Sequence, residues 1–198
     1  MTASHDAEHF RRLYARSTDP WAFRTSAYEK EKYRQTIAAL GERRFRSGFE
    51  PGCSIGVLTR MLAERCDNLL AADIIEEPLH TARSFCDDLP SVRFVRMRIP
   101  AEWPDGRFDL IVLSEVLYFL SPRDIAAVAA HVLAALDAEG VVLSVNWRGR
   151  GNDPCGGDEA ATIFLRETQP WLQVTFQYHT PSYRIDLLVR HQEQAGEP

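Results

Sequence analysis

A glycine-rich turn carries the pattern most typical of ligand binding in this chain. The turn spans Glu50–Gly56 (EPGCSIG) and precedes a segment of helical periodicity. Gly52 and Gly56 have no Cβ, so the backbone can turn tightly and approach a ligand, while Ser54 can cap the helix. The free amides at the start of that helix would then face the ligand. An ordinary glycine-containing turn is the alternative interpretation.

Asp73, at the end of the next predicted strand, extends this pattern. A carboxylate there can accept hydrogen bonds from both hydroxyls of an adenosine ribose, and otherwise it is an exposed strand-end acid or a helix cap. A dinucleotide is disfavoured, because Ser54 stands where a pyrophosphate needs glycine and the last glycine comes one residue early. The letters G-x-S-x-G also fit a hydrolase with Ser54 as nucleophile. Its base is poorly supported, since the late histidines fall in a helix, a hairpin and the tail, at His131, His179 and His191.

Short apolar runs alternate with segments of helical periodicity along the chain. We expect buried strands at 68–73, 92–97, 108–113 and 140–145, after a first strand at 43–49 that is poor in apolar residues. We expect helices around 57–62, 79–85 and 125–136, the last begun by Ser121-Pro122 and stopped by Gly140. Alternating apolar residues at 172–178 and 183–189 predict a hairpin.

Strands that alternate with helices form parallel βαβ units, so the sequence predicts the α/β class. We expect a Rossmann-like, doubly wound, seven-stranded mixed sheet with an antiparallel C-terminal hairpin. Residues 1–198 form one domain in this interpretation, with an N-terminal helical cap at 1–40 and an α/β core at 41–190. Ligands of such sheets bind at the carboxyl ends of the strands, so the chemistry should lie in the strand-to-helix loops.

The composition is that of an ordinary globular protein, with 45% apolar and 26% charged residues. Lys and Arg total 23 against 28 Asp and Glu, a formal charge of −5, which disfavours a nucleic-acid partner. No apolar run approaches the ~20 residues that span a bilayer, so we expect no membrane partner and a cytoplasmic location. The four cysteines lack zinc-ligand spacing, so we expect neither a metal site nor a disulfide framework.

Several motifs together resemble the class I S-adenosylmethionine-dependent methyltransferases. They are Phe49–Gly56, Ala72-Asp73 and Phe108–Leu120 (FDLIVLSEVLYFL). A narrower resemblance is to the NodS-like methyltransferases, the N-methyltransferases of nodulation-factor synthesis. It rests on Asp19–Arg24 (DPWAFR) with Tyr28-Glu29, the SEVLY run, and Gly157–Glu159. The resemblance extends from about Asp19 to Val189 and implies a seven-stranded fold whose last strand is antiparallel.

The resemblance also implies a site for S-adenosylmethionine as cofactor. The glycine turn would face its methionine part, Asp73 its ribose, and the turn at Arg98 and Ile99 its adenine, with apolar contact from Ile74 or Ile99. Trp21 and Arg24 would close over the cofactor, Arg24 pairing with its carboxylate; a core anchor and a surface charge are the alternatives. The full expected set is Trp21, Arg24, Gly52, Ser54, Gly56, Asp73, Ile74, Ile99 and Ser114.

Methyl transfer from a sulfonium needs an electron-rich acceptor held in line with the methyl group. An amine acceptor must lose its proton before it attacks, and Glu115 and Tyr118, just after the fourth strand, are placed to receive it. Alternatively, Glu115 holds a backbone amide or the cofactor's ammonium, and Tyr118 packs under the cap. Trp147 offers the acceptor a stacking face, while Asp158 and Glu159 could attract a cationic amine or simply begin a helix.

These inferences lead to three hypotheses of decreasing support. The first is a methyltransferase of a small-molecule acceptor, with N-methylation of an amino sugar or a deacetylated chitooligosaccharide as its specific form. The second is a methyltransferase-like fold that binds a nucleoside or a partner without turnover, favoured by Arg98 where an adenine-binding acid is common. The third is a small α/β hydrolase using Ser54.

Overall fold

The computed structural model describes residues 3–149 and 151–191 and contains one seven-stranded sheet. Its strands are β1 (Gly48–Pro51), β2 (Leu69–Asp73), β3 (Val92–Arg96), β4 (Phe108–Ser114), β5 (Leu136–Trp147), β6 (Leu172–His179) and β7 (Tyr183–Arg190). The helices are α1 (Ala7–Tyr14), α2 (Ala27–Ala38), α3 (Val57–Ala63), α4 (Glu76–Phe85), α5 (Pro122–Ala135) and α6 (Gly157–Thr168), with a 3-10 turn η1 (Leu117–Phe119).

The strand order is β3-β2-β1-β4-β5-β7-β6. Strands β1 to β5 pair in parallel, and β7 lies antiparallel between β5 and β6. The predicted α/β class, the seven-stranded mixed sheet and the C-terminal hairpin are therefore confirmed. The order reverses at β1, which pairs with both β2 and β4, so a crevice is expected at the carboxyl end of β1.

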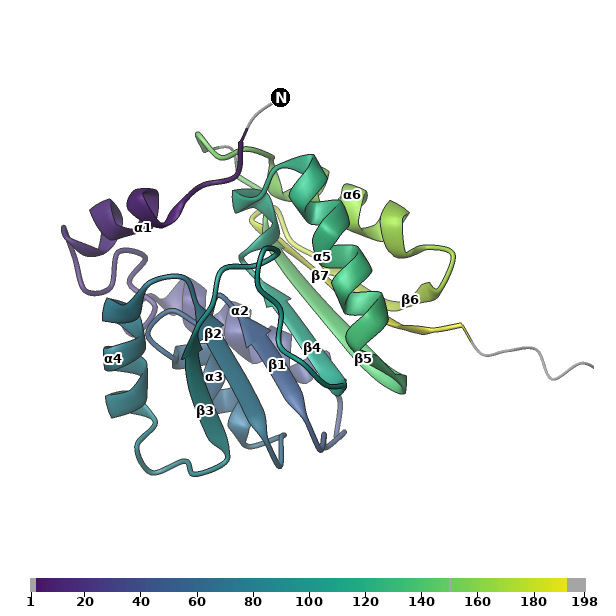
Figure 1. The fold of residues 1–198 in the computed structure, drawn as a ribbon, viewed down its shortest axis with the longest axis horizontal. Helices are drawn as coiled ribbons and strands as arrows, with labels where there is room; N and C mark the ends of the chain where they lie inside the picture. Colours follow the sequence, from purple (N-terminus) through teal and green to yellow (C-terminus); the bar gives the residue numbers. More distant parts are fainter. Residues whose placement is uncertain (1–2, 150, 192–198) are drawn as a thin grey trace, which may run out of the picture.

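Helices cover both faces of the sheet, with α5 and α6 in front and α2 and α3 behind it in Figure 1. Successive residues of a strand point to opposite faces, and β4 shows this directly. Ile111 belongs to the apolar cluster that contains Val128 of α5, whereas Leu110 belongs to the cluster that contains Leu62 of α3. Burial on both faces explains why β4 is a continuous apolar run.

The N-terminal forty residues divide into two parts with different positions. Helix α1 lies over one end of the sheet, at the upper left of Figure 1, and none of its residues is buried. Helix α2 packs instead on the rear face, where Tyr33 joins Leu58 and Leu62 of α3 in the core. Helix α1 thus lies over the end of the sheet, while α2 belongs to the layered core.

Two strand boundaries differ from the prediction, and each involves a closely packed glycine. Strand β1 begins at Gly48 rather than at residue 43, and a Cβ on Gly48 would lie 2.9 Å from both Cys66 Sγ and Leu69 Cδ1. Helix α5 begins at Pro122 with Ser121 as its cap, as expected, but it ends at Ala135. Strand β5 follows at once, and Gly140 lies inside that strand, where a Cβ would come within 2.7 Å of Leu136 Cδ1.

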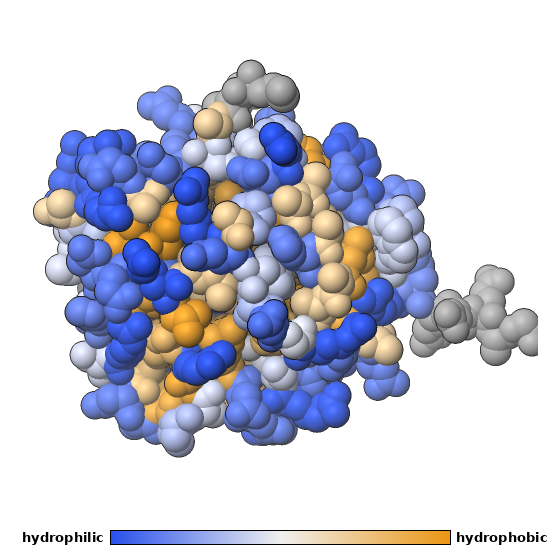
Figure 2. Space-filling view, in the orientation of Figure 1, coloured by the Kyte–Doolittle hydropathy of each residue, from blue (hydrophilic) through white to orange (hydrophobic). Residues whose placement is uncertain are grey.

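The front face carries a partly apolar surface between α4 and α5, surrounded by charged residues (Figure 2). Val95, Met97 and Trp103 pack against the front core while remaining partly exposed. Within residues 3–149 and 151–191, no helix is both long and apolar enough to cross a lipid bilayer.

Candidate active site

A cavity of about 1020 Å³ lies where the strand order reverses. Its walls come from the loops after β1, β2, β3 and β4, from α1, from the first half of α2, and from the end of β5. Cavities for small molecules usually measure about 300–1,000 Å³, so this one has room for a ligand of cofactor size. Its lining residues run from Ala3 to Asp153, and the ends of neighbouring strands lie at its base.

The glycine turn after β1 forms part of the cavity wall, and its backbone is bare at Gly52. Gly52 has a φ of +81°, and a Cβ there would lie 2.2 Å from Val116 Cγ1. Only glycine adopts this backbone without strain and without that clash. The bend therefore brings the main chain to the wall of the cavity, as the sequence predicted.

Asp73, at the end of β2, holds the turn in place. One carboxylate oxygen accepts the amide of Ser54 at 3.0 Å, and the other accepts the amide of Ile75 at 2.9 Å. Burial raises the pKa of Asp73 to about 6, although these amide hydrogen bonds oppose the rise. Each oxygen has a further lone pair, so the carboxylate can still accept two ligand hydroxyls.

Two expectations about this turn are wrong. Ser54 does not cap α3: the cap position is Gly56, which offers no side chain, and the Ser54 hydroxyl instead lies 2.5 Å from the hydroxyl of Tyr14. Gly56 does not line the cavity; its φ is +82°, and a Cβ would meet Ala82 of α4 at 3.0 Å. Its role is the close packing of α3 on α4.

The wall beside Asp73 is apolar. The amide of Met97 donates to the carbonyl of Asp73 at 2.9 Å, which brings the segment after β3 alongside the end of β2. Ile74, Arg98 and Ile99 line the cavity there, and Ser114 lines it at the end of β4. Ile74 and Ile99, which the resemblance assigns to the adenine, thus share one wall of the cavity with Asp73.

A buried polar cluster faces the cavity from the loop after β4 and from α2. The Tyr118 hydroxyl donates to Glu115 Oε2 at 2.6 Å, and Lys32 Nζ lies 3.2 Å from Glu115 Oε1. Lys32 also donates to Glu29 at 3.1 Å. Burial and the neighbouring Glu115 carboxylate raise the pKa of Tyr118 far above its usual range, so this phenol stays protonated and donates.

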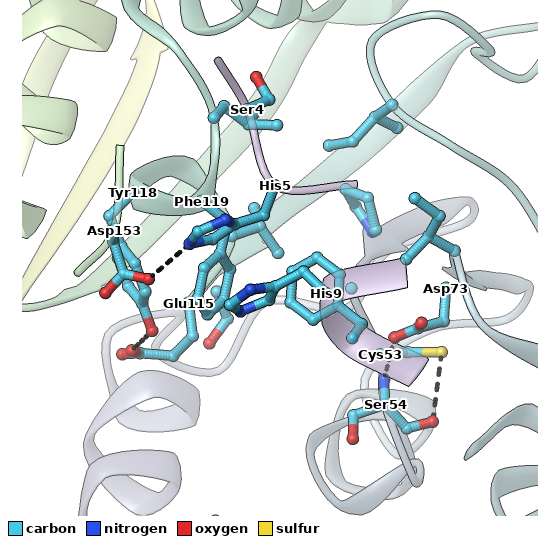
Figure 3. Close-up of a pocket in the computed structure, with 18 of the residues that line it drawn as sticks. Ser4, His5, His9, Cys53, Ser54, Asp73, Glu115, Tyr118, Phe119 and Asp153 are labelled. Atoms are coloured by element: carbon cyan, nitrogen blue, oxygen red, sulfur yellow. Dashed lines mark hydrogen bonds and ion pairs between the residues drawn. The ribbon is translucent and has the colours of Figure 1, made fainter. Parts of the chain in front are cut away.

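Figure 3 shows the two ends of the site and what lies between them. Glu115, Tyr118 and Asp153 lie on one side of the cavity. Asp73 and Ser54 lie on the other side, and the His9 ring of α1 lies between the two groups. The cavity therefore joins the site predicted for a nucleoside to the acid and phenol predicted to serve the acceptor.

The N-terminal segment closes the cavity through contacts that the sequence analysis did not find. His5 Nε2 lies 3.1 Å from Asp153 Oδ1, and the His5 amide donates to the Phe119 carbonyl at 2.9 Å. Phe10 packs edge-on against Phe119, with ring centroids 5.1 Å apart. These partners lie more than a hundred residues apart in sequence, so no local pattern signals them.

Three further predicted residues have mixed outcomes. Trp21 lines the cavity and packs edge-on against Tyr14, with ring centroids 5.7 Å apart, and Trp147 lines the cavity as well. Arg24 lies outside it, because its guanidinium stacks over the Phe85 ring at 4.8 Å. This position rules out the expected pairing of Arg24 with a ligand carboxylate in this conformation.

The acids expected to attract an amine also lie elsewhere. Asp158 pairs with Arg148 at 3.0 Å and lies 3.6 Å from Arg184, and Glu159 is exposed at the start of α6. Neither lines the cavity. They serve the first turn of α6, which is the alternative that their position in the sequence left open.

Two other chemistries find little support in the described residues. Ser54 Oγ pairs with the Tyr14 hydroxyl rather than with a histidine, so the hydrolase interpretation lacks its base. No group of three His, Cys, Asp or Glu side chains in residues 3–149 and 151–191 comes together as metal ligands.

The sheet order, the antiparallel β7 and the cavity at the carboxyl end of β1 define the class. This is the Rossmann-like fold of the S-adenosylmethionine-dependent methyltransferases. A family model described as Nodulation protein S (NodS) matches residues 4–144, and the chain belongs to this family. The predicted family and fold class are both confirmed.

Known proteins show how far this similarity extends. A nodulation protein S of Bradyrhizobium diazoefficiens is 32% identical over 115 residues, which are 58% of this chain and 54% of that protein, so the chain spans about half of that relative's length. A solved structure of a putative methyltransferase from Pseudomonas syringae has a TM-score of 0.73 at 37% identity, and the alignment covers 83% of this chain and 100% of that one.

The fold is also shared with a second solved structure. N-methyltransferase NodS from Bradyrhizobium japonicum WM9, in complex with S-adenosyl-L-homocysteine, has a TM-score of 0.82 at 21% identity, over 93% of this chain and 98% of that one. At this level of identity the likeness establishes the fold.

Proposed function

We propose that the protein is an S-adenosylmethionine-dependent N-methyltransferase of a small-molecule acceptor. One observation carries the proposal: a single cavity joins Gly52 and Asp73 at one end to Glu115 and Tyr118 at the other. Membership of the NodS family supports it, as does the N-methyltransferase activity named for the neighbour that binds S-adenosyl-L-homocysteine.

The residues at the first end fit the cofactor. Gly52 presents bare backbone at the wall of the cavity, and the Asp73 carboxylate keeps lone pairs for two ribose hydroxyls. Ile74 and Ile99 supply apolar surface for an adenine ring. When bound, S-adenosylmethionine would supply a methyl group on a positively charged sulfur, and transfer would need that group in line with the acceptor.

The residues at the other end fit an amine acceptor. An ammonium group must first release a proton, and the Glu115 carboxylate can receive it. The neutral nitrogen then forms its bond to the methyl carbon while the carbon–sulfur bond breaks, which leaves a methylammonium and an uncharged sulfide. Tyr118 donates to Glu115 throughout and holds its carboxylate in one orientation.

We propose an amino sugar or a deacetylated chitooligosaccharide as the acceptor. The nodulation relatives support this class, and so do the aromatic rings that line the cavity beside Glu115, namely Phe119 and Trp147. Flat apolar faces of this kind pack well against the C–H faces of sugar rings.

Two measurements test the proposal. Calorimetry should show that S-adenosylhomocysteine binds the wild type and that Asp73→Ala weakens this binding at least about tenfold, because hydrogen bonds to a charged partner are lost. Labelled methyl groups should then reach deacetylated chitooligosaccharides and not their fully acetylated forms. A wild type that binds no S-adenosylhomocysteine contradicts the enzyme, and binding without transfer to any amine favours a non-catalytic binding protein.

A further inference from the structure

We infer that His5, held by Asp153, is the base that takes the proton from the acceptor amine. The inference rests on the proposed function and deepens it, because it names the side chain that receives the proton before the nitrogen attacks. Asp153 acts on the reaction through His5 and is a positioning residue.

The two side chains form a partly buried pair in the wall of the cavity. His5 Nε2 lies 3.1 Å from Asp153 Oδ1, and the two side chains are 17% and 19% exposed. Both residues line the cavity. Figure 3 shows Asp153 on the side of Glu115 and Tyr118, which is the end proposed for the acceptor.

The Asp153 carboxylate determines which nitrogen of the His5 ring can accept a proton. A carboxylate accepts hydrogen bonds, so Nε2 carries the hydrogen of the neutral ring and Nδ1 keeps its lone pair. Within the part of the chain that the structure describes, the ring has no other hydrogen bond. When Nδ1 takes up a proton, the carboxylate stabilises the imidazolium that forms.

Three contacts hold the His5 ring in this position. The His9 ring stacks on it, with centroids 3.7 Å apart and an angle of 6° between the planes. The His5 amide donates to the Phe119 carbonyl at 2.9 Å, and the hydroxyl of the preceding Ser4 accepts the amide of Ser121 at 2.7 Å. Proton transfer from a bound amine requires a base that is placed as firmly as this.

The charges around the ring are compatible with an imidazolium. Burial, and then the neighbouring His5 ring, lower the pKa of His9, so His9 stays neutral near pH 7 and does not repel it. On the cavity wall around His5, three carboxylates outnumber two guanidinium groups. The charged and titratable side chains there, besides His9, are Asp153, Glu115, Asp124, Tyr118, Arg98 and Arg123.

Glu115 is the weaker base of the two groups at this end of the cavity. Its carboxylate accepts a hydrogen bond from Tyr118 and lies 3.2 Å from Lys32 Nζ, and both contacts favour the charged form. It therefore attracts the ammonium group of the acceptor. Imidazole gains and loses a proton near neutral pH, which suits it to take that proton and release it again in each cycle.

The step needs no further reactant. An N–H bond of the ammonium breaks and its proton bonds to His5 Nδ1, which leaves a neutral amine and an imidazolium. The lone pair of the amine then forms the bond to the methyl carbon, while the electrons of the carbon–sulfur bond pass to sulfur. The product is a methylammonium, and the imidazolium returns its proton to water.

The test compares His5→Gln, Asp153→Asn and their double variant with His80→Gln. His80 lies 3.2 Å from Glu76 on α4, outside the cavity, so it is a matched pair of a histidine and a carboxylate. For each protein we would measure the Tm, the Kd of S-adenosylhomocysteine, and the kcat and KM for fully deacetylated chitotetraose between pH 6 and pH 9.

We expect His5→Gln to lower kcat at pH 7 about a hundredfold, because a positioned base contributes about 10²–10⁴-fold. The loss should shrink as the pH rises, since more of the bound amine is then neutral without a base. Asp153→Asn should lower kcat with the same pH dependence, and the double variant should be no slower than His5→Gln, because the pair acts as one unit. The Kd of S-adenosylhomocysteine should change less than about twofold in these variants, and His80→Gln should match the wild type.

Two further measurements distinguish a base from a structural contact. Added imidazole should restore part of the activity of His5→Ala, whereas pyrazole, which has the same size but is a much weaker base, should not. Diethyl pyrocarbonate acylates neutral imidazole rings, and mass spectrometry locates the label. With S-adenosylhomocysteine and chitotetraose bound together, labelling of His5 should slow while labelling of His80 stays the same.

The inference is overturned if His5→Gln keeps kcat within about twofold of the wild type over the whole pH range. A loss that does not vary with pH and that imidazole does not rescue also overturns it, because a structural contact behaves in this way. Should the Tm show that His5→Gln fails to fold, Asp153→Asn applies the same criteria. A wild type that methylates no amine contradicts the proposed function and the inference with it, whereas an active wild type with an unaffected His5→Gln contradicts the inference alone.

Discussion

The carboxylate of Asp73 is buried, yet it remains available to a ligand. Its two oxygens already accept the amides of Ser54 and Ile75, which hold it at the end of β2. Its pKa, raised to about 6 by burial, means that the folded protein binds the proton more tightly than the unfolded chain does. This group therefore lowers folding stability as the pH rises from about 4 to 6, and it becomes a good acceptor for hydroxyls over the same range.

We predict that S-adenosylhomocysteine binding weakens as the pH falls from 7 to 5. Below a pKa of about 6 the Asp73 carboxyl is protonated and accepts hydroxyl hydrogen bonds poorly. Calorimetry between pH 5 and pH 8 measures the effect. Because His5 and His9 line the same cavity, the control is Asp73→Asn, whose weaker binding should lose most of the pH dependence. If the Kd changes equally with pH in both proteins, a group other than Asp73 is responsible for the pH dependence.

Gly52 allows a prediction with a matched control. Gly52→Ala places a methyl group 2.2 Å from Val116 Cγ1, so either the turn or η1 must shift. We expect a loss of about 1–3 kcal/mol in the free energy of unfolding and at least tenfold weaker S-adenosylhomocysteine binding. Gly41→Ala has a similar positive φ of +59° but meets no atom within 4 Å, so it should lose only the smaller backbone contribution and bind normally. Equal effects in the two variants would contradict the steric explanation.

At the scale of single residues, sequence reasoning found the parts of the site that follow strands. Asp73 and Glu115 stand at the ends of apolar runs, and Gly52 belongs to a glycine-rich turn before a helical segment, so their place at the carboxyl edge follows from the α/β pattern. It missed Glu29 and Lys32, because two charges three positions apart on a helix are typical of a solvated surface. Their burial depends on what packs over α2, which local spacing does not encode.

At the scale of elements, α1 is the part held least firmly. None of its residues is buried, and its contacts to the rest of the molecule include the Tyr14–Ser54 hydrogen bond and the Phe10–Phe119 ring contact. Segments with few buried contacts open locally at low cost in free energy. The helices that cover the sheet have much larger buried faces, with Val128 and Val132 of α5 fully enclosed.

We predict that trypsin cleaves after Arg11 and Arg12 before it cleaves the core. Both side chains are more than half exposed, and α1 can open without unfolding the sheet. Tyr14→Phe, which removes the hydrogen bond to Ser54, should accelerate this cleavage, and S-adenosylhomocysteine should slow it in the wild type. Mass spectrometry of timed digests gives the rates, with Tyr178→Phe in the hairpin as control. Cleavage of α1 only at the rate of global unfolding would contradict the prediction.

Element boundaries show where periodicity stops being informative. The sequence predicts a helix over 125–136 that Gly140 terminates. In the structure α5 ends at Ala135, and β5 begins at the next residue, Leu136. The structure uses that glycine to fit the strand against Leu136, and the helix ends without a glycine. Similarly, Ser54 has the side chain of a helix cap but lies two residues too early, because Gly56 occupies the cap position.

At the scale of the whole molecule, β7 joins the hairpin to the parallel sheet. Asp186 lies opposite Ser144 of β5 and Gln177 of β6, and it is fully buried. It accepts hydrogen bonds from Arg184 at 2.8 and 2.9 Å and from Gln177 at 2.6 Å. The alternation of apolar residues predicted this hairpin, but it gave no sign of a buried ion pair at the junction.

We predict that Asp186→Ala lowers the free energy of unfolding by about 3–5 kcal/mol, because it leaves the Arg184 guanidinium buried without its main partner. Urea denaturation followed by circular dichroism measures the loss. The double variant Arg184→Met with Asp186→Leu should recover most of it, since apolar side chains of similar volume can replace a buried pair. A double variant no more stable than Asp186→Ala would show that the site requires charge.

The cavity has a rigid floor of strand ends and a roof made largely of α1. In the proposed reaction, a demethylated cofactor and a methylated product would therefore leave by displacing one short helix, while the sheet stays in place. If that displacement is the slow step of each cycle, variants in α1 will change turnover without changing the chemical step. A pre-steady-state burst of product in the wild type that is absent in a variant with a loosened α1 would show that product release limits turnover.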